Sequence, residues 1–256
     1  MDILLVIISS SFFPVDILSK MLNFFPSLSL WFEVPSMDSI ELFDSIAIMM
    51  SFNVSSTFKK YSRINNSRGY TADEIARKIL DDNGLYNVQI ERVRGNLSDH
   101  YDPRDNVVRL SDTVYGKTSV AAIGVAAHEC GHAVQHAQGY TPIKIRSAII
   151  PVTQLGSQLA YPLVLIGLIM GGNSVLINIG IWLFVAVVAF QLVTLPVEFD
   201  ASGRALKTLE DSGYLDREEV KCSRKVLTAA ALTYVAALFT AIAQLVRLIA
   251  ISNRRN

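Results

Sequence analysis

The chain has 256 residues, of which 51% are hydrophobic and only 18% are charged, with 23 basic and 23 acidic side chains. This composition excludes a disordered chain, and the lack of a basic surplus argues against a nucleic-acid-binding protein. The charge is also uneven, because residues 147–197 contain no Asp, Glu, Lys or Arg. Since so long an uncharged stretch cannot be a solvated surface, the composition indicates an integral membrane protein with one polar region of moderate size.

The N-terminal segment, residues 1–58, has an ambiguous pattern. Residues 42–57 within it are apolar but short, and Asp44 lies near their start. Basic residues follow from Lys59 onwards, so a helix ending there would have its C-terminal side in the cytoplasm by the positive-inside rule. The sequence leaves open whether a segment within 40–58 spans the membrane.

The polar region, residues 59–146, begins with a clear helix signal. Thr71 and Glu74 match a capping box, in which each side chain bonds the other residue's backbone N–H. A helix is therefore expected to start near Thr71 and to stop at Asn83-Gly84.

Two strands and a second helix are expected in the rest of this region. Residues 86–92 and 106–110 have the composition and alternation of strands. Residues 118–138 form the expected helix, with Thr118 as its cap, and this stretch is rich in Ala and Gly. Because small side chains let neighbouring backbones approach closely, the helix is expected to be packed on most sides.

Residues 147–197 are expected to form a transmembrane hairpin. A spanning helix needs about 20 apolar residues. Residues 147–172 and 175–196 both meet that length, and Gly171-Gly172-Asn173-Ser174 is the short link between them.

The charges beside the hairpin predict its orientation. Lys144 and Arg146 precede it, and six basic residues lie in 198–226, the segment expected to form the next helix. By the positive-inside rule both flanks are cytoplasmic. We therefore expect an integral protein of the plasma membrane whose polar region faces the cytoplasm.

The C-terminal segment, residues 227–256, is expected to be a further membrane helix. Its residues 227–246 are apolar and rich in Ala. If this helix spans, Arg254 and Arg255 lie outside, against the positive-inside rule. The alternatives are a helix lying in or against the membrane and a buried core helix.

The helix over 118–138 contains His128-Glu129-Cys130-Gly131-His132, an H-E-x-x-H motif. Side chains four residues apart share one helical face, so the two imidazoles can bind one Zn²⁺. Glu129 is then placed to reach a water rather than the metal, as the general base of a metallopeptidase does. The alternative, two ordinary histidines and a surface Glu, fits poorly in so apolar a helix.

A catalytic zinc usually has three protein ligands. His136 lies about 12 Å along the helix axis from the first ligand, and His100 lies in a polar turn, so a carboxylate is expected instead. Glu198 is the best candidate by its position after the hairpin, with Asp200 as the alternative. Pro196 is expected in the first turn of the helix that carries them.

Two long stretches, GVAAHECGHAVQHA at 124–137 and QLVTLPVEFDASGRAL at 191–206, together with shorter ones at 56–62, 66–69 and 97–103, carry a family resemblance. On these residues the chain resembles the neutral zinc metallopeptidase family of YugP-type membrane proteins. It is more distantly similar to HtpX-like membrane gluzincins, whose third ligand is the Glu of an E-x-x-x-D helix. Carried over by position, that Glu is Glu198. Ser202 stands where the Asp would be, and Asp200 is the candidate to replace that acid.

The resemblance implies a mainly α membrane protein. It would have a transmembrane helix hairpin, a further apolar helix and a small α+β zincin-like metalloprotease region. The implied function is a zinc-dependent membrane endopeptidase, in which His128, His132 and Glu198 hold Zn²⁺ and Glu129 activates a water. The implied partners are a peptide or protein substrate, membrane proteins included, and the lipid bilayer, with no nucleic acid. The strand over 106–110 is expected to offer its edge to an extended substrate.

Two other functions are weighed against this one. A non-catalytic membrane protein with a structural zinc site needs a fourth ligand, such as Cys130 or His100, but Cys130 lies about 200° around the helix from His128. A metal transporter needs intramembrane acids or histidines, which residues 147–197 lack. For stabilising an oxyanion, Arg204 and His136 are the candidates.

Overall fold

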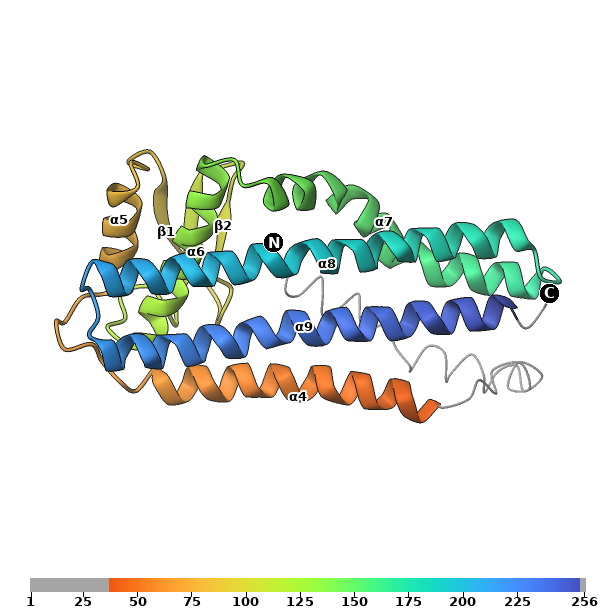
Figure 1. The fold of residues 1–256 in the computed structure, drawn as a ribbon, viewed down its shortest axis with the longest axis horizontal. Helices are drawn as coiled ribbons and strands as arrows, with labels where there is room; N and C mark the ends of the chain where they lie inside the picture. The colour runs from red at the N-terminus through yellow and green to blue at the C-terminus, as the bar shows by residue number, and fades with distance from the viewer. Residues whose placement is uncertain (1–36, 254–256) are drawn as a thin grey trace. The chain divides into compact units, whose positions relative to one another are not determined.

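The structure, a computed structural model, describes residues 37–253 (Figure 1). Residues 1–36 lie outside the described residues. So do Arg254 and Arg255, which the positive-inside argument used. The described elements are, in chain order, α4 (Met37–Tyr61), α5 (Ala72–Asp82), β1 (Gln89–Val93), β2 (His100–Asp102), β3 (Val107–Ser111), α6 (Val120–Ala137), α7 (Thr141–Ile169), α8 (Ser174–Asp211) and α9 (Arg217–Asn253).

The chain divides into two compact units. Among the described residues, the helical unit consists of residues 37–49, Ala148–Leu192 and residues 235–253, and the sheet unit consists of Met50–Ser147 and Val193–Tyr234. Helices α4, α7, α8 and α9 each contribute residues to both units.

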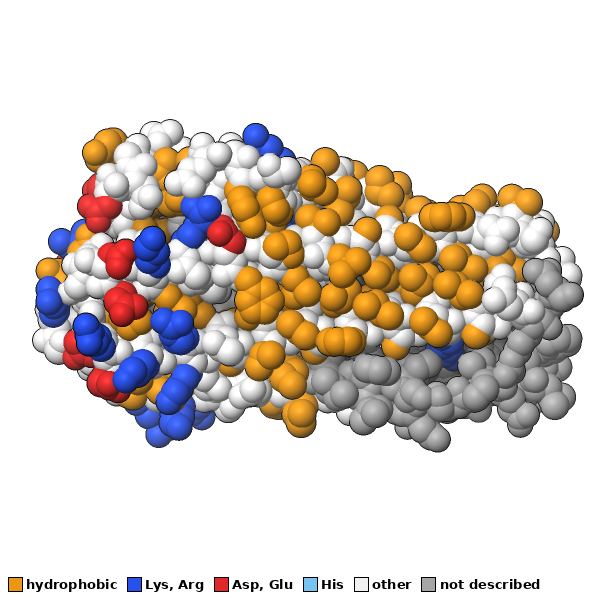
Figure 2. Space-filling view, in the orientation of Figure 1, with side chains coloured by type: hydrophobic (Ala, Val, Ile, Leu, Met, Phe, Trp, Pro, Cys, Tyr) orange, Lys and Arg blue, Asp and Glu red, His pale blue; other side chains and the backbone are white. Residues whose placement is uncertain are grey.

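The helical unit has the surface of a membrane protein. Among the described helices, α7, α8 and α9 are long and apolar enough to cross a membrane, whereas α4, which covers the segment 40–58, is not among them. Large apolar side chains point outwards on α7 and α8, with Ile169, Val175 and Trp182 exposed by 60%, 64% and 72%. Figure 2 shows such apolar side chains gathered along these helices. The predicted fold class, a mainly α membrane protein with a small α+β region, is confirmed.

The prediction that a new helix starts at Pro196 is wrong. Pro196 lies inside α8, which continues without a break from Ser174 to Asp211. Membrane helices tolerate proline, because neighbouring groups satisfy the backbone carbonyl that the proline leaves without an N–H partner. Gly213, just beyond the end of α8, has a φ of +62°, a conformation in which glycine commonly ends a helix. As a result, one continuous helix contains both the second half of the predicted hairpin and Glu198.

The sheet has the order β1-β3-β2, with β1 parallel and β2 antiparallel to β3. The strands predicted at 86–92 and 106–110 correspond to β1 and β3, but β2 was expected to be a turn. It is only three residues long, a length that leaves almost no alternation to read. Because β3 is paired on both sides, the prediction that its edge binds substrate is wrong. The edge strands on either side of it are β1 and β2.

Helix α6 lies at the centre of the sheet unit. Its cap is Ser119, whose side chain accepts from the backbone N–H of Ala122, rather than the predicted Thr118. The capping box of α5 formed by Thr71 and Glu74 is confirmed. Ala121, like much of the apolar surface of α6, is fully buried in a core shared with α5, β3 and the adjoining parts of α8 and α9.

Glycines bring neighbouring helices close to α6. A Cβ on Gly131 would lie 2.7 Å from the carbonyl oxygen of Ala201 on α8, and a Cβ on Gly124 would lie 3.1 Å from Cβ of Ser223 on α9. The Ser223 hydroxyl donates to the Val120 carbonyl at 2.8 Å. The small residues of the H-E-x-x-H helix therefore allow backbone contact with the helix that carries Glu198.

Candidate metal centre

His128 and His132 lie one turn apart on the same face of α6. Their ring centroids are 4.7 Å apart and the ring planes are nearly perpendicular, at 82°. Both side chains are largely buried, with 15% and 12% of their surface exposed. The i, i+4 spacing of the motif thus places two imidazoles at one point, as the sequence predicts.

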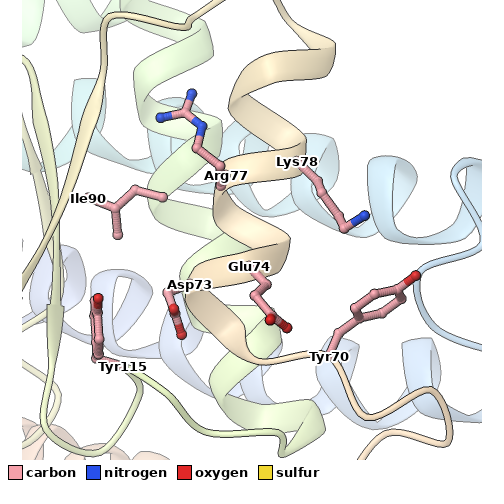
Figure 3. Close-up of a pocket in the computed structure, with 7 residues that line it drawn as sticks. All are labelled: Tyr70, Asp73, Glu74, Arg77, Lys78, Ile90 and Tyr115. Carbon is pink, nitrogen blue, oxygen red and sulfur yellow. The ribbon is translucent and has the colours of Figure 1, made fainter.

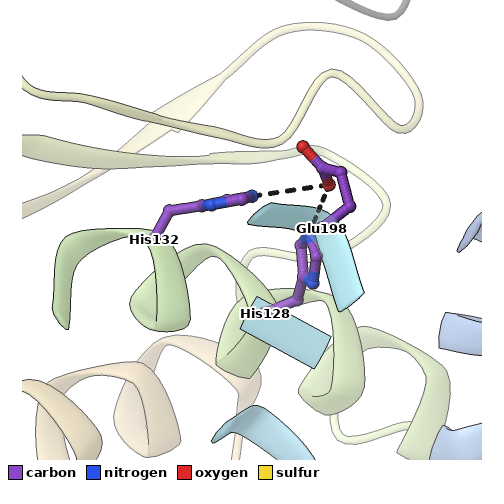
Figure 4. Close-up of side chains that lie close together, drawn as sticks. All are labelled: His128, His132 and Glu198. Atoms are coloured by element: carbon purple, nitrogen blue, oxygen red, sulfur yellow. Dashed lines mark ion pairs between the residues drawn. The ribbon is translucent and has the colours of Figure 1, made fainter. Parts of the chain in front are cut away.

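Glu198 approaches both imidazoles from α8. Its Oε2 lies 3.3 Å from Nε2 of His128 and 3.6 Å from Nε2 of His132 (Figure 4). The three side chains point toward one another, and their ligand atoms all lie within 4.8 Å of each other. Among the described residues, this group is the one whose His, Cys, Asp and Glu atoms lie close enough to share a metal ion.

The atoms in this group fit a zinc ion. Glu198 Oε2 is buried and has no hydrogen-bond partner within the described part of the chain. A buried carboxylate oxygen without a donor is costly, unless a cation or a proton compensates it. Two imidazole nitrogens and one carboxylate oxygen are the donor set of a catalytic zinc site, which leaves a fourth position open.

A hydrogen-bond network fixes the tautomer of His132. Its Nδ1 lies 3.0 Å from Oε1 of Gln135, a side chain that is fully buried. The Gln135 amide nitrogen donates at 2.8 Å both to the Val197 carbonyl and to Asp200 Oδ2. Since this identifies the atom facing the ring as the oxygen, His132 Nδ1 must carry the proton, and Nε2 keeps its lone pair for a metal.

Ser202 is the hydrogen-bond partner of His128 Nδ1. Its hydroxyl lies 3.1 Å from His128 Nδ1, at the position where the resembling gluzincins have an Asp. Asp200, proposed from sequence as an alternative ligand or as a replacement acid, is not in the metal group. It instead accepts from Gln135 and from Arg204, at 2.8 and 2.5 Å, so it supports His132 indirectly.

Glu129, between the two histidines, is buried and faces the same region. Burial raises the pKa of Glu129 to about 7, and the charges of Asp99 and Glu198 add to this, whereas His128 and the backbone N–H of Tyr101 on β2 oppose it. A carboxylate with a pKa near neutrality is well matched to accepting and returning a proton at physiological pH.

The other residues weighed from sequence lie elsewhere. His136 is exposed, with its ring 6.1 Å from that of Tyr101, and His100 Nδ1 bonds the carbonyl of Ser98 at 2.9 Å. Cys130 points toward α5, where its Sγ contacts the Ala76 carbonyl, and burial raises the pKa of its thiol. A structural zinc site requires a fourth protein ligand. Among the described residues, neither His100 nor Cys130 joins the metal group to provide one.

Two residues near Glu198 were not identified as site residues from the sequence. Arg146 on α7 donates through Nη1 to Glu198 Oε1 at 3.3 Å, and the Tyr234 side chain on α9 interacts with the same carboxylate. For Arg146, the sequence contains a signal that could have identified it. Arg146 is the last charged residue before the uncharged stretch 147–197, and Glu198 is the first after it.

A separate pocket of about 630 Å³ lies beside α5 and contains none of the metal-group residues (Figure 3). Its charged side chains already serve the fold. Asp73 accepts from the backbone N–H of Gly116, Glu74 belongs to the capping box, and Arg77 pairs with Asp81. The metal group is therefore the candidate functional site.

The fold and the metal group together define a class: a mainly helical membrane protein whose H-E-x-x-H helix lies against a helix bearing a carboxylate. The comparisons with known proteins narrow this class. The family described as "Putative neutral zinc metallopeptidase" matches residues 40–253, so the chain belongs to this family.

The chain is also similar to "Putative membrane protease YugP" of Bacillus subtilis (strain 168). The two are 48% identical over 206 residues, which cover 80% of this chain and 91% of that relative. No solved structure matches the chain.

Proposed function

We propose that this protein is a zinc-dependent membrane endopeptidase of the gluzincin type. His128, His132 and Glu198 are the zinc ligands and Glu129 is the general base. The observation that carries the proposal is the convergence of His128 Nε2, His132 Nε2 and the buried Glu198 Oε2, next to a buried Glu129.

The mechanism assigns each side chain a distinct task. A zinc ion bound here would polarise the substrate carbonyl and lower the pKa of a water. Glu129 takes a proton from the attacking water and returns it to the leaving amine, a task that its raised pKa suits. Gln135 keeps the Nδ1 proton on His132, and the Ser202 hydroxyl can accept the Nδ1 proton of His128, so both rings can present Nε2 to the same point.

The substrate is proposed to be an extended peptide bound along β2. This strand pairs with β3 on one side and, among the described strands, has no partner on the other. The backbone N–H of Tyr101 in β2 reaches Glu129, so this strand lies at the reacting groups. An extended segment adding to such an edge would be held by main-chain hydrogen bonds, with little demand on its sequence.

The membrane arrangement follows the charge pattern. We propose that 147–197 is a transmembrane hairpin, and that 59–146 and 198–226 form the catalytic region, facing the cytoplasm from the plasma membrane. Lys144 and Arg146 before the hairpin and the basic residues of 198–226 support this orientation. The segment 227–256 supplies a further membrane helix through α9.

Zinc content per chain tests the metal centre. Detergent-purified wild-type protein should hold one zinc ion, and the His132→Ala and Glu198→Ala variants should hold none. Zinc that survives Glu198→Ala would contradict the assigned third ligand. A wild-type protein without zinc, after purification in zinc-containing buffer, would contradict the metal centre altogether.

The Glu129→Gln variant tests the catalytic role separately. Gln has nearly the same shape but cannot accept the proton, so peptide hydrolysis should fall by about 10²–10⁴-fold while zinc content stays at one per chain. Cleavage of a casein or mixed-peptide substrate, followed by mass spectrometry, provides the measurement. Undiminished hydrolysis in this variant would rule out Glu129 as the base.

A further inference from the structure

The guanidinium of Arg146 is buried against the proposed third zinc ligand. Its Nη1 lies 3.3 Å from Glu198 Oε1, and the two side chains are 9% and 4% exposed. The partners are 52 positions apart in the chain. An arginine placed only to mark the cytoplasmic side of a membrane helix would have its head group in water, so burial against the Glu198 carboxylate needs another explanation.

The two oxygens of Glu198 have different surroundings. Oε1 accepts from Arg146, whereas Oε2 faces Nε2 of His128 and of His132. The last torsion of a glutamate side chain is broad, because rotation about an sp³–sp² bond meets little barrier. Without a partner on Oε1, the carboxylate could turn and offer both oxygens to the same cation. The contact with Arg146 removes this freedom.

Stability alone is a weak reason for such a pair. Removing two charges from water costs free energy that their attraction often fails to recover, so buried ion pairs rarely add to folding stability. A positive charge near a metal site also opposes binding of a cation. Holding a ligand in a defined geometry does account for the arrangement, because catalytic constellations need to be held to about 0.5 Å.

On these grounds we infer that Arg146 is a positioning residue for the metal centre. By engaging Oε1, it makes Glu198 a ligand through Oε2 alone, and one coordination position stays available for water. This inference rests on the proposed zinc site. It assigns a second role to Arg146, the last charged residue before the uncharged stretch 147–197. From α7, this residue also orients the ligand on α8.

The test is the visible absorption spectrum of cobalt-substituted protein, which reports coordination number and does not depend on activity. Arg146→Met removes the guanidinium and keeps much of its volume, whereas Arg146→Gln offers a shorter polar side chain should the first variant fail to fold. In both variants Glu198 loses the guanidinium on Oε1, and we expect a shift of the bands and a loss of intensity, as four-coordinate cobalt gains a ligand.

Arg77→Met is the matched control. Arg77 bonds Asp81 and the carbonyls of Val88 and Leu85, so its loss perturbs the sheet unit without touching Glu198. Its cobalt spectrum should match that of the wild type.

Each outcome is decisive. A changed spectrum in a folded Arg146 variant, together with an unchanged control, supports the inference. A wild-type spectrum in either folded variant overturns it and leaves the zinc centre standing, as does an equal change in the control. A wild-type protein that binds neither cobalt nor zinc overturns the proposed centre, and the inference with it.

Discussion

In both units glycines allow two helices to approach closely, but the side chains around these contacts differ. In the helical unit, a Cβ on Gly156 would lie 2.5 Å from the Leu183 carbonyl, and one on Gly180 would lie 2.7 Å from that of Ala160. In the sheet unit, a Cβ on Gly131 would lie 2.7 Å from the Ala201 carbonyl. Glycine thus permits backbone contact in both units.

The two helix contacts differ in the side chains that lie beside them. The α7–α8 contact in the helical unit lies among apolar side chains, and its outer surface bears exposed groups such as Leu155 and Ile179. The α6–α8 contact lies beside His128, His132 and Glu198, which it brings within range of one another. Close helix packing is therefore a general feature of this protein, and the chemistry depends on the polar residues placed next to one such contact.

The largest effect is expected when the same substitution is made at both helix contacts. Gly131→Val in the sheet unit should push α8 away from α6, lower the free energy of unfolding by about 1–3 kcal/mol and abolish zinc binding. Gly180→Val in the helical unit should be destabilising to a similar degree but leave one zinc per folded chain. Thermal unfolding and zinc content, measured on the same samples, provide the check.

Equal loss of zinc in the two glycine variants would contradict the comparison. It would mean that the geometry of the metal group depends on packing throughout the chain rather than on the local contact between α6 and Ala201.

A smaller effect is expected from the network behind His132. Gln135→Leu fills similar volume but cannot accept the Nδ1 proton, and it leaves Asp200 with one donor fewer. Loss of such supporting bonds usually lowers metal affinity by about 10–100-fold. Competition with a chromophoric chelator measures this directly. An affinity equal to that of the wild type would show that ring orientation is set by packing alone.

Ser202 allows a milder change on the other imidazole. Ser202→Ala removes one neutral partner from His128, so zinc affinity should fall by about 10-fold, the low end of the range for supporting residues. Ser202→Asp, which restores the acid found in the resembling gluzincins, should regain or exceed wild-type affinity. A larger loss in the Asp variant than in the Ala variant would contradict this role for position 202.

The local parts of the fold and site could be predicted from the sequence. His128 and His132 are related by one helical turn, and Thr71 with Glu74 by the geometry of a cap, so neither relation depends on the rest of the chain. Glu198 was predicted as the third ligand from its place after the hairpin and from the family resemblance. The uncharged stretch 147–197 was sufficient to predict membrane helices.

The remaining features depend on contacts between distant residues. Gln135 meets Val197 across 62 positions and Arg146 meets Glu198 across 52, and no periodicity in the sequence encodes such a meeting. The short β2 is a strand because β3 pairs with it, whereas its own residues favour a turn. Pro196 suggested a helix start by its local preference, but the continuous α8 overrides that preference.

The smallest expected effect has the opposite sign. Gly203 lies on α8, two residues from Ala201, but a Cβ built there meets nothing within 4 Å. Glycine inside a helix costs about 0.5–1 kcal/mol relative to alanine, because it loses more backbone freedom on folding. Gly203→Ala should therefore raise the free energy of unfolding by that amount and leave zinc content unchanged, as measured by thermal unfolding and metal analysis. A destabilised Gly203→Ala would indicate that α8 tolerates no change near the metal group. The result expected for Gly131→Val would then no longer point specifically to backbone contact with α6.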